Sequence, residues 1–288
     1  MIQLQIVSGL VSAAILFLVA SGLTLIFGVC HILNLAHGAF FMLAGFLAFT
    51  IASRFADSAA GFWLALAFAP LALAALGALV EVALFRRLYR ADILLQVLPT
   101  IAIVYLIGDA VRFFWGLEPL RVRTPAGLDA PIAIFGALFP AYYAVIIAVA
   151  AAVAGGIWWI VFRTDWGLLI RAIAQDRDMA AALGADVGRI FTSVFALGIW
   201  LAGVGGVLSA PIGGANLGTD MDFVVEAFAV VVVGGLGSVG GSAVAAILIG
   251  MLKGFGILVY PQFALAFVFA LMALILVVRP TGLFGAKE

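Results

Sequence analysis

The first 53 residues of this chain contain no Asp, Glu, Lys or Arg, and the first formal charge is Arg54. Over all 288 residues only 10% are charged and 67% are hydrophobic, and the mean hydropathy is +1.32. Soluble domains carry roughly 25% charged residues. A water-soluble fold could not bury so much apolar surface, so the composition predicts a protein whose solvent is lipid. The first apolar run lacks the basic region of a signal peptide, so we interpret it as retained membrane helix.

Further apolar runs follow the first one along the whole chain. A helix needs about 20 apolar residues to cross the hydrocarbon core. Two runs, 39–53 and 223–235, are short for this and are expected to be half-helices or re-entrant segments. The sequence therefore predicts an all-α fold, a polytopic transmembrane helical bundle with about eight crossings, as a single domain over residues 1–288. The runs lie near 7–29, 39–53, 63–85, 97–115, 138–161, 190–210, 223–235, 241–258 and 262–278.

The distribution of Arg and Lys predicts how the bundle is oriented. Loops 86–96, 163–189 and 279–288 carry nine basic residues, whereas loops 54–62 and 112–137 carry four. Because cytoplasmic loops are enriched in basic residues, the first group and the C-terminus are predicted to be cytoplasmic, and 112–137 is expected to be an external loop. The side of the N-terminus stays open. The nine are Arg86, Arg87, Arg90, Arg163, Arg171, Arg177, Arg189, Arg279 and Lys287, and the four are Arg54, Arg112, Arg121 and Arg123.

Two glycine-containing segments suggest an internal repeat. HILNLAHGAFFMLAGFLAF (31–49) and VVVVGGLGSVGGSAVAAILIG (230–250) both combine glycines and small polar residues with an apolar helix, as in transporters whose site lies between two repeats. The second segment also imitates nucleotide motifs. GLGSVG lacks the acidic residue expected about 20 positions later, and Gly241 occupies the position of the P-loop lysine. We therefore expect these glycines to allow close helix packing or a backbone turn, and we expect no ATP hydrolysis by this chain.

Segment 163–189 holds eight of the chain's 28 formal charges between long apolar runs. Its part from Arg171 to Leu183 is rich in alanine, which favours helix, and Gly184 supplies a helix stop. We expect a short alanine-faced helix that docks into a groove on another protein. A solvated connector is the alternative interpretation.

Several polar residues lie in apolar surroundings, where they need partners or water. Asn34 and His37 would share one face if their stretch were helical, and they either join helices by hydrogen bonds or line a pathway. Glu226 and Lys253 are expected either to pair or face one cavity, or to snorkel near the interface. Asp109 and Arg112 suggest a local ion pair. Asp220 and Asp222 either help to receive a substrate ammonium group or end a solvated loop.

The lone Cys30 indicates neither a disulfide nor a metal site, and His31 is the only histidine besides His37, so a metal site is not expected. The formal net charge of zero gives no indication of nucleic acid as a partner.

Four segments together resemble a known family. The chain is similar to the permease subunits of branched-chain amino-acid ABC importers, in particular the H-type (LivH-like) subunit. The matching segments occur in family order and extend over nearly the full length. They are SGLTLIFGVCHILNLAHGAFFMLAGF (21–46), RTDWGLLIRAIAQDRDMAAALGADVGRI (163–190), VVVVGGLGSVGGSAVAAILIG (230–250) and RPTGLFG (279–285).

This resemblance implies a multi-pass protein of the bacterial inner membrane that forms half of a translocation pathway. Its implied partners are a second permease subunit (LivM-like), two cytoplasmic ATP-binding subunits and a periplasmic or lipid-anchored substrate-binding protein. No cofactor and no catalytic residue are expected on this chain, since ATP would be hydrolysed on the partners. The matching loop 163–189 becomes the ATPase-coupling segment, with Arg171, Asp176, Ala180, Ala181 and Gly184. The expected pathway residues are Asn34, His37, Gly38, Gly234, Gly235 and Gly237, to which the burial argument adds Glu226.

Two other functions remain open from the residues. One is an ABC permease for urea, short amides or sugars, and the other is a proton-coupled secondary transporter that uses Glu226. A membrane enzyme is a more distant alternative, because no catalytic triad, metal cluster or pair of carboxylates can be assembled from the sequence.

Overall fold

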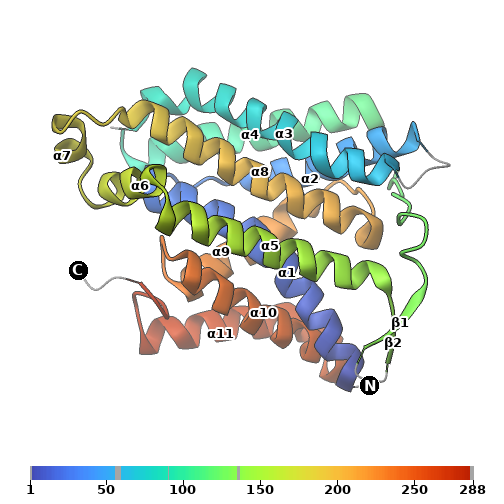
Figure 1. Ribbon diagram of the computed structural model, residues 1–288. Helices are drawn as coiled ribbons and strands as arrows, with labels where there is room; N and C mark the ends of the chain where they lie inside the picture. The colour runs from blue at the N-terminus through green and yellow to red at the C-terminus, as the bar shows by residue number, and fades with distance from the viewer. Residues whose placement is uncertain (1, 56–59, 90, 135–136, 286–288) are drawn as a thin grey trace.

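Long, roughly aligned helices make up most of the molecule (Figure 1). A computed structural model describes residues 2–55, 60–89, 91–134 and 137–285. The elements are α1 (Ile2–Cys30), α2 (Ala36–Ser53), α3 (Ala60–Ala83), η1 (Phe85–Arg87), α4 (Ile93–Trp115), β1 (Pro131–Ile134), β2 (Ala137–Pro140), α5 (Ala141–Arg163), α6 (Asp165–Gln175), α7 (Arg177–Ala182), α8 (Val187–Gly213), α9 (Thr219–Gly234), α10 (Val239–Val259), η2 (Pro261–Phe263) and α11 (Ala264–Val278).

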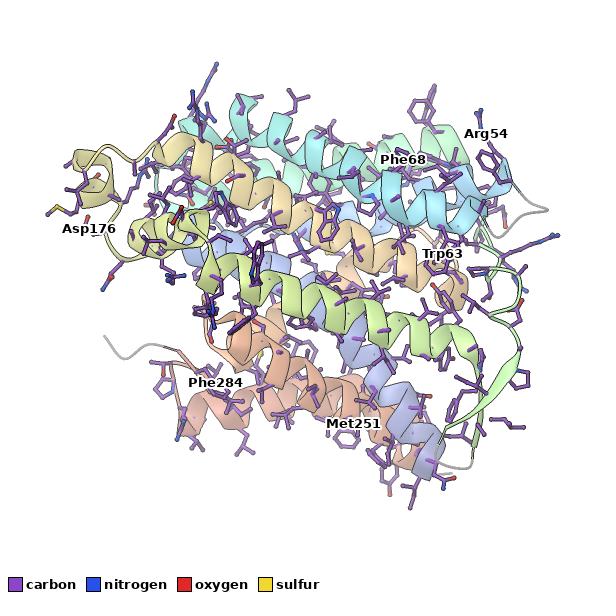
Figure 2. The ribbon with its side chains drawn as sticks, viewed as in Figure 1. Arg54, Trp63, Phe68, Asp176, Met251 and Phe284 are labelled. Carbon is purple, nitrogen blue, oxygen red and sulfur yellow. The ribbon has the colours of Figure 1, made fainter. Side chains whose placement is uncertain are left out.

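Among the described residues, eight helices are long and apolar enough to cross a membrane, namely α1, α2, α3 with η1, α4, α5, α8, α10 and η2 with α11. The prediction of about eight crossings in an all-α bundle is therefore confirmed. Large apolar side chains on the outer helices are exposed, among them Phe68 (59%) and Trp63 (44%) of α3, which are labelled in Figure 2. Such apolar outer faces suit contact with lipid.

The two short apolar runs form two different kinds of helix. The run 223–235 belongs to α9, whose 16 residues extend about 24 Å and fall short of the roughly 30 Å hydrocarbon core. The run 39–53 belongs to α2, which has 18 residues but begins inside the bundle. Its first turn contains His37, whose Nε2 lies 2.9 Å from the carbonyl oxygen of Val19, a residue well inside α1. The chain therefore returns into the bundle between α1 and α2 before α2 starts.

Helix packing is reciprocal between two parts of the chain, α1–α4 and α8–α11. The most extensive helix packing is between α1 and α10, followed by that between α3 and α8. In the first pair, α1, the first helix of α1–α4, packs on α10, the third helix of α8–α11. In the second pair, α8, the first helix of α8–α11, packs on α3, the third helix of α1–α4. Where α1 crosses α8, Gly22 and Gly198 each lie against the other's carbonyl oxygen. Such reciprocal contacts indicate two inverted halves, α1–α4 and α8–α11.

The sequence correspondence of the halves differs from the expected one. Segment 31–49 was expected to correspond to 230–250, but the pattern of its residues recurs in the end of the α8–α9 loop and the first part of α9. Asn-Leu, Phe and Phe recur there with identical spacing, as 34–46 against 216–228. Two matched residues also meet in space, since the rings of Phe41 and Phe223 have centroids 4.1 Å apart. The shared glycine content of 31–49 and 230–250 does not identify corresponding segments, because small residues recur wherever helices pack closely.

The basic loops of the predicted cytoplasmic group gather at one end of the bundle, which we call the α7 end. Arg86 reaches the carbonyl oxygen of Gly188, and Phe284 lines a cavity together with Arg171. Loop 116–130 and the β1–β2 hairpin lie at the opposite end, called the hairpin end, where α1 begins (Figure 1). Segment 112–137, expected to be a loop, also contains regular structure, because α4 includes its first residues and β1 begins at Pro131. Arg90 and Lys287 lie outside the described residues.

Candidate functional site

The first turns of α2 and α9 meet in the interior of the bundle. A Cβ atom on Gly38 would overlap with the carbonyl oxygen of Asp220 and would lie 2.9 Å from Cβ of Val224. Only glycine therefore lets these helix ends approach so closely. Asp220 and Asp222 occupy the first turn of α9, where acidic side chains are favoured by the helix dipole. Their proposed contact with a substrate ammonium group stays a prediction.

Asn34 and His37 lie next to this junction and are completely enclosed by protein. Asn34 precedes α2 in a non-helical stretch, so the two residues do not share a helical face. Within the described residues, both side-chain atoms of the Asn34 amide and Nδ1 of His37 have no hydrogen-bond partner. Nε2 of His37 contacts Val19. The His37 ring therefore joins α2 to α1, while the Asn34 amide is held in the interior with its hydrogen-bonding capacity unused.

The glycine-rich turn between α9 and α10 lies at the α7 end. Gly235 and Gly237 have φ values of +100° and +82°, a backbone region that favours glycine. Gly234 lies directly against Gly241 where α9 and α10 cross. The hydroxyl of Ser238 caps α10 by accepting a 3.0 Å hydrogen bond from the Gly241 amide. Val230–Val233 are helical, so no strand precedes this turn and the dinucleotide-binding interpretation fails on structure as well.

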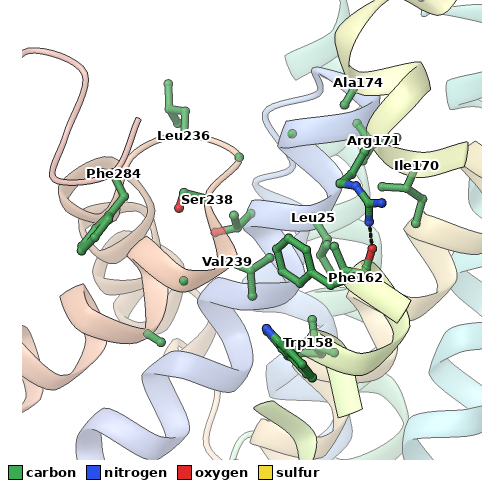
Figure 3. A pocket seen from close by; sticks show the side chains of 18 of the residues that line it. Leu25, Trp158, Phe162, Ile170, Arg171, Ala174, Leu236, Ser238, Val239 and Phe284 are labelled. Atoms are coloured by element: carbon green, nitrogen blue, oxygen red, sulfur yellow. Dashed lines mark hydrogen bonds between the residues drawn. The ribbon is translucent and has the colours of Figure 1, made fainter. Parts of the chain in front are cut away.

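A cavity of about 720 Å³ separates this turn from α5 and α6 (Figure 3). Trp158, Phe162 and Arg171 line one wall, and Leu236 and Val239 line the other. Arg171 donates a hydrogen bond to the carbonyl oxygen of Val161, and its guanidinium lies 5.6 Å from the centroid of the Phe162 ring. The cavity therefore brings together one expected coupling residue, Arg171, and one expected pathway residue, Gly237.

Glu226 and Lys253 form an ion pair between α9 and α10. Nζ of Lys253 lies 2.6 Å from Oε1 of Glu226. The side chain of Lys253 is 28% exposed and that of Glu226 is 6% exposed. Both residues also line a cavity of about 180 Å³ towards the hairpin end. The expectation that they pair or face one cavity is thus confirmed in both respects. Asp109 and Arg112 form the expected local pair at 3.1 Å, and both side chains are largely exposed.

The coupling segment contains two helices, not the single helix expected from Arg171 to Leu183. The helix is interrupted at Asp176, whose backbone is extended and whose carboxylate accepts a 2.9 Å hydrogen bond from the Met179 amide. Aspartate is a strong N-cap, and this capping bond starts a new helix where alanine content alone favours continuation. Gly184, with φ +93°, comes directly after the C-cap of α7 and so marks the end of this helix, as predicted. Of the two expected coupling alanines, Ala180 is buried and Ala181 is exposed.

Sequence reasoning missed the strongest polar cluster near this segment. Glu81 is fully buried in α3. Its carboxylate accepts hydrogen bonds from Tyr89 at 2.8 Å and from Thr192 at 2.5 Å, and it pairs with Arg86 at 3.4 Å. Burial and the neighbouring carboxylate raise the pKa of Tyr89, so its hydroxyl stays protonated. The available signal was the isolated acid in the apolar run 63–85, which is the same signal that singled out Glu226.

This cluster connects α7 to the bundle. The guanidinium of Arg177, the first residue of α7, lies 5.7 Å from the ring centroid of Tyr89 and 5.1 Å from that of Phe191. The Tyr89 and Phe191 rings pack edge to face at 4.5 Å. Meanwhile Met179 and Leu183 are 57% and 82% exposed. The segment therefore has one face anchored to buried side chains and another that presents apolar groups to the outside.

Comparisons with known proteins point to one family. A family model described as branched-chain amino acid transport system / permease component matches residues 5–278. The chain is 28% identical to the high-affinity branched-chain amino acid transport system permease protein BraD of Pseudomonas aeruginosa and 25% identical to LivH of Escherichia coli. Both similarities include 99% of this chain and 96% of the relative. No solved structure matches at a significant level.

Proposed function

The chain belongs to the family of branched-chain amino acid transport permease components, and from this premise we propose that it is the membrane-spanning permease subunit of an ABC importer. Its substrates would be leucine, isoleucine, valine or related amino acids. It would lie in the bacterial inner membrane and form half of the translocation pathway. The chain itself would be no enzyme, and ATP would be hydrolysed on partner subunits.

The observation that carries this proposal is the construction of the α7 end. An exposed apolar surface at the end of α7, formed by Met179 and by Leu183, the residue that follows the helix, is joined through Arg177 to the buried Tyr89–Glu81 cluster. A protein that docks on this surface would therefore push on side chains packed between α1, α3 and α8. This supports docking by cytoplasmic ATPases, since an apolar knob on a charged loop suits a groove in another protein.

The pathway would follow non-helical segments inside the bundle, namely the stretch before α2 and the turn between α9 and α10. The junction of α2 and α9 places Asn34, His37 and Gly38 inside the bundle, and the turn with Gly235 and Gly237 borders the large cavity at the α7 end. Inverted repeats whose broken helices meet near mid-membrane support alternating access around a central site. ATP-driven closure of the partner subunits would move α6 and α7 and so change the width of this cavity.

The remaining partners and the orientation follow from the same proposal. The α7 end would face the cytoplasm, because the basic loops gather there. A second permease subunit would complete the pathway, and a periplasmic or lipid-anchored binding protein would deliver substrate at the hairpin end. Glu226, the residue that a proton-coupled carrier would use, is engaged in an ion pair with Lys253, which gives that alternative no free carboxylate at this position.

Reconstitution into vesicles tests the proposal. Vesicles that contain this chain, a second permease, the ATPases and the binding protein are expected to accumulate leucine only when ATP is supplied on the ATPase side. Vesicles that contain this chain alone should accumulate none, with or without a proton gradient. Accumulation by the chain alone under a proton gradient would contradict the ABC assignment and favour the secondary transporter. Uptake of urea or a sugar in place of leucine would leave the transport class intact and correct the substrate.

A further inference from the structure

The ion pair of Glu226 and Lys253 lies on the wall of a cavity whose charged, polar and apolar residues are complementary to an amino acid. We propose that these two side chains bind the charged backbone groups of the transported amino acid, with the substrate ammonium on Glu226 and the substrate carboxylate on Lys253. This assignment rests on the proposed function and adds the residues that would recognise the substrate inside the membrane.

The pair has unused capacity for such a ligand. Lys253 contacts only Oε1 of Glu226, while Oε2 is buried and has no partner among the described residues. A carboxylate accepts several hydrogen bonds and an ammonium group donates three. A zwitterion placed beside the pair would therefore supply the missing donor to Oε2 and an acceptor for the free N–H bonds of Lys253. The result would be a ring of alternating charges in which no ion is left without a partner.

The rest of the cavity suits the other parts of an amino acid. Its volume of about 180 Å³ is below the roughly 300–1,000 Å³ of sites for drug-sized ligands, so it fits a single small solute. Ile15, Leu16 and Phe223 give it an apolar wall for a branched side chain, whereas Ser12 and Asn216 add polar groups. Gly214 and Asn216 also place the cavity beside the α8–α9 loop, towards the proposed outer side.

Comparison of the two halves argues against a purely structural role for the Glu226–Lys253 ion pair. In the alignment of 34–46 with 216–228, the position of Glu226 corresponds to Ala44, so the first half packs its equivalent helix without a charge. A buried ion pair adds little stability over well-packed apolar residues because both ions lose their hydration. Ionisable groups within membrane segments are therefore by default candidates for a functional site.

The test measures binding of radiolabelled leucine, by scintillation proximity at millimolar concentrations, to the purified permease–ATPase complex without its binding protein. Leucine should compete. Leucinamide lacks the carboxylate and 4-methylpentanoate lacks the ammonium group, so each should compete about tenfold or more weakly, since each loses a charge-assisted hydrogen bond. The variant Glu226→Gln/Lys253→Met should lose leucine binding yet melt at the temperature of the unmodified complex. The matched control, Asp109→Asn/Arg112→Met, neutralises an exposed pair and should bind leucine normally.

Leucine binding by Glu226→Gln/Lys253→Met at the unmodified affinity would overturn the inference. If that variant does not fold, the competition series on the unmodified complex decides, because equal competition by leucinamide, 4-methylpentanoate and leucine would overturn it too. ATP-driven uptake by the complete unmodified importer separates the two proposals. Absence of any branched-chain uptake would reject the proposed function, whereas normal uptake with failed competition would reject only this binding site.

Discussion

The phenol of Tyr89 donates a 2.8 Å hydrogen bond to Oε1 of Glu81, and so holds the loop after α3 against a fully buried carboxylate. The same ring receives the guanidinium of Arg177 from α7. Two side chains therefore connect the exposed coupling segment to the interior of the bundle. A displacement of α7 would therefore act on α3 through this contact.

Replacement of Glu81 by Ala is expected to destabilise the protein by about 1–3 kcal/mol, because Tyr89 and Thr192 would lose a buried acceptor. The measurement is the midpoint of unfolding in a denaturing detergent titration of the purified protein. Asp109→Ala serves as the control, since it removes one partner of an exposed ion pair, which adds little stability. Equal midpoints for the two variants would show that the Glu81 cluster does not stabilise the fold.

Gly38→Ala is expected to destabilise the bundle by about 1–3 kcal/mol and to lower the rate of uptake, because the new methyl group would overlap with the Asp220 carbonyl oxygen where α2 and α9 meet. Gly155→Ala is the matched substitution in α5, where an added Cβ atom has nothing within 4 Å. It should be neutral or stabilise the helix by about 0.5–1 kcal/mol. Thermal melting of both variants in detergent checks the difference, and a Gly38→Ala protein as stable as Gly155→Ala would argue against close packing at this junction.

The apolar runs alone predicted the number of crossings and the short α9, because burial of backbone in lipid leaves helix as the available structure. They did not predict that α2 begins inside the bundle. That position follows from the non-helical stretch that contains Asn34 and from the contact of His37 with Val19, which depend on tertiary packing. The pairing of Glu226 with Lys253 was accessible from sequence because both are isolated charges in apolar surroundings.

The coupling segment shows the opposite limit of sequence reasoning. Alanine content favours one helix through Asp176, but a single capping bond from its carboxylate ends that helix and begins another. Propensity acts over many residues, whereas an N-cap acts through one hydrogen bond of comparable energy. The anchoring of Arg177 on Tyr89 and Phe191 could not be predicted, because Tyr89 is distant in sequence from the other two residues and only tertiary packing brings it to them.

Loss of the Asp176 cap should loosen α7 without unfolding the bundle. Asp176→Ala removes the acceptor of the Met179 amide, which destabilises a helix by about 1 kcal/mol. Amides in segment 177–184 should then exchange with solvent about fivefold faster, as measured by hydrogen–deuterium exchange. The control is Asp178→Ala, which removes the same charge from the first turn of α7 but leaves the cap. Unchanged exchange in Asp176→Ala would mean that tertiary contacts alone hold α7.

The docking surface formed by Met179 and Leu183 can be separated from its anchor by substitution at the more exposed of these two residues. Leu183 is 82% exposed, so Leu183→Glu should leave the folded yield and melting temperature unchanged. In an assembled importer the new charge would lie against an apolar groove, and desolvating it would weaken ATPase binding about tenfold or more. Co-purification of the ATPases and ATP-driven leucine uptake measure this loss. The control Leu117→Glu changes a residue that is 72% exposed beyond α4, at the hairpin end, and should retain both activities. ATPase binding that survives Leu183→Glu but is lost in Leu117→Glu would place the docking surface at the opposite end of the molecule and would reverse the proposed orientation.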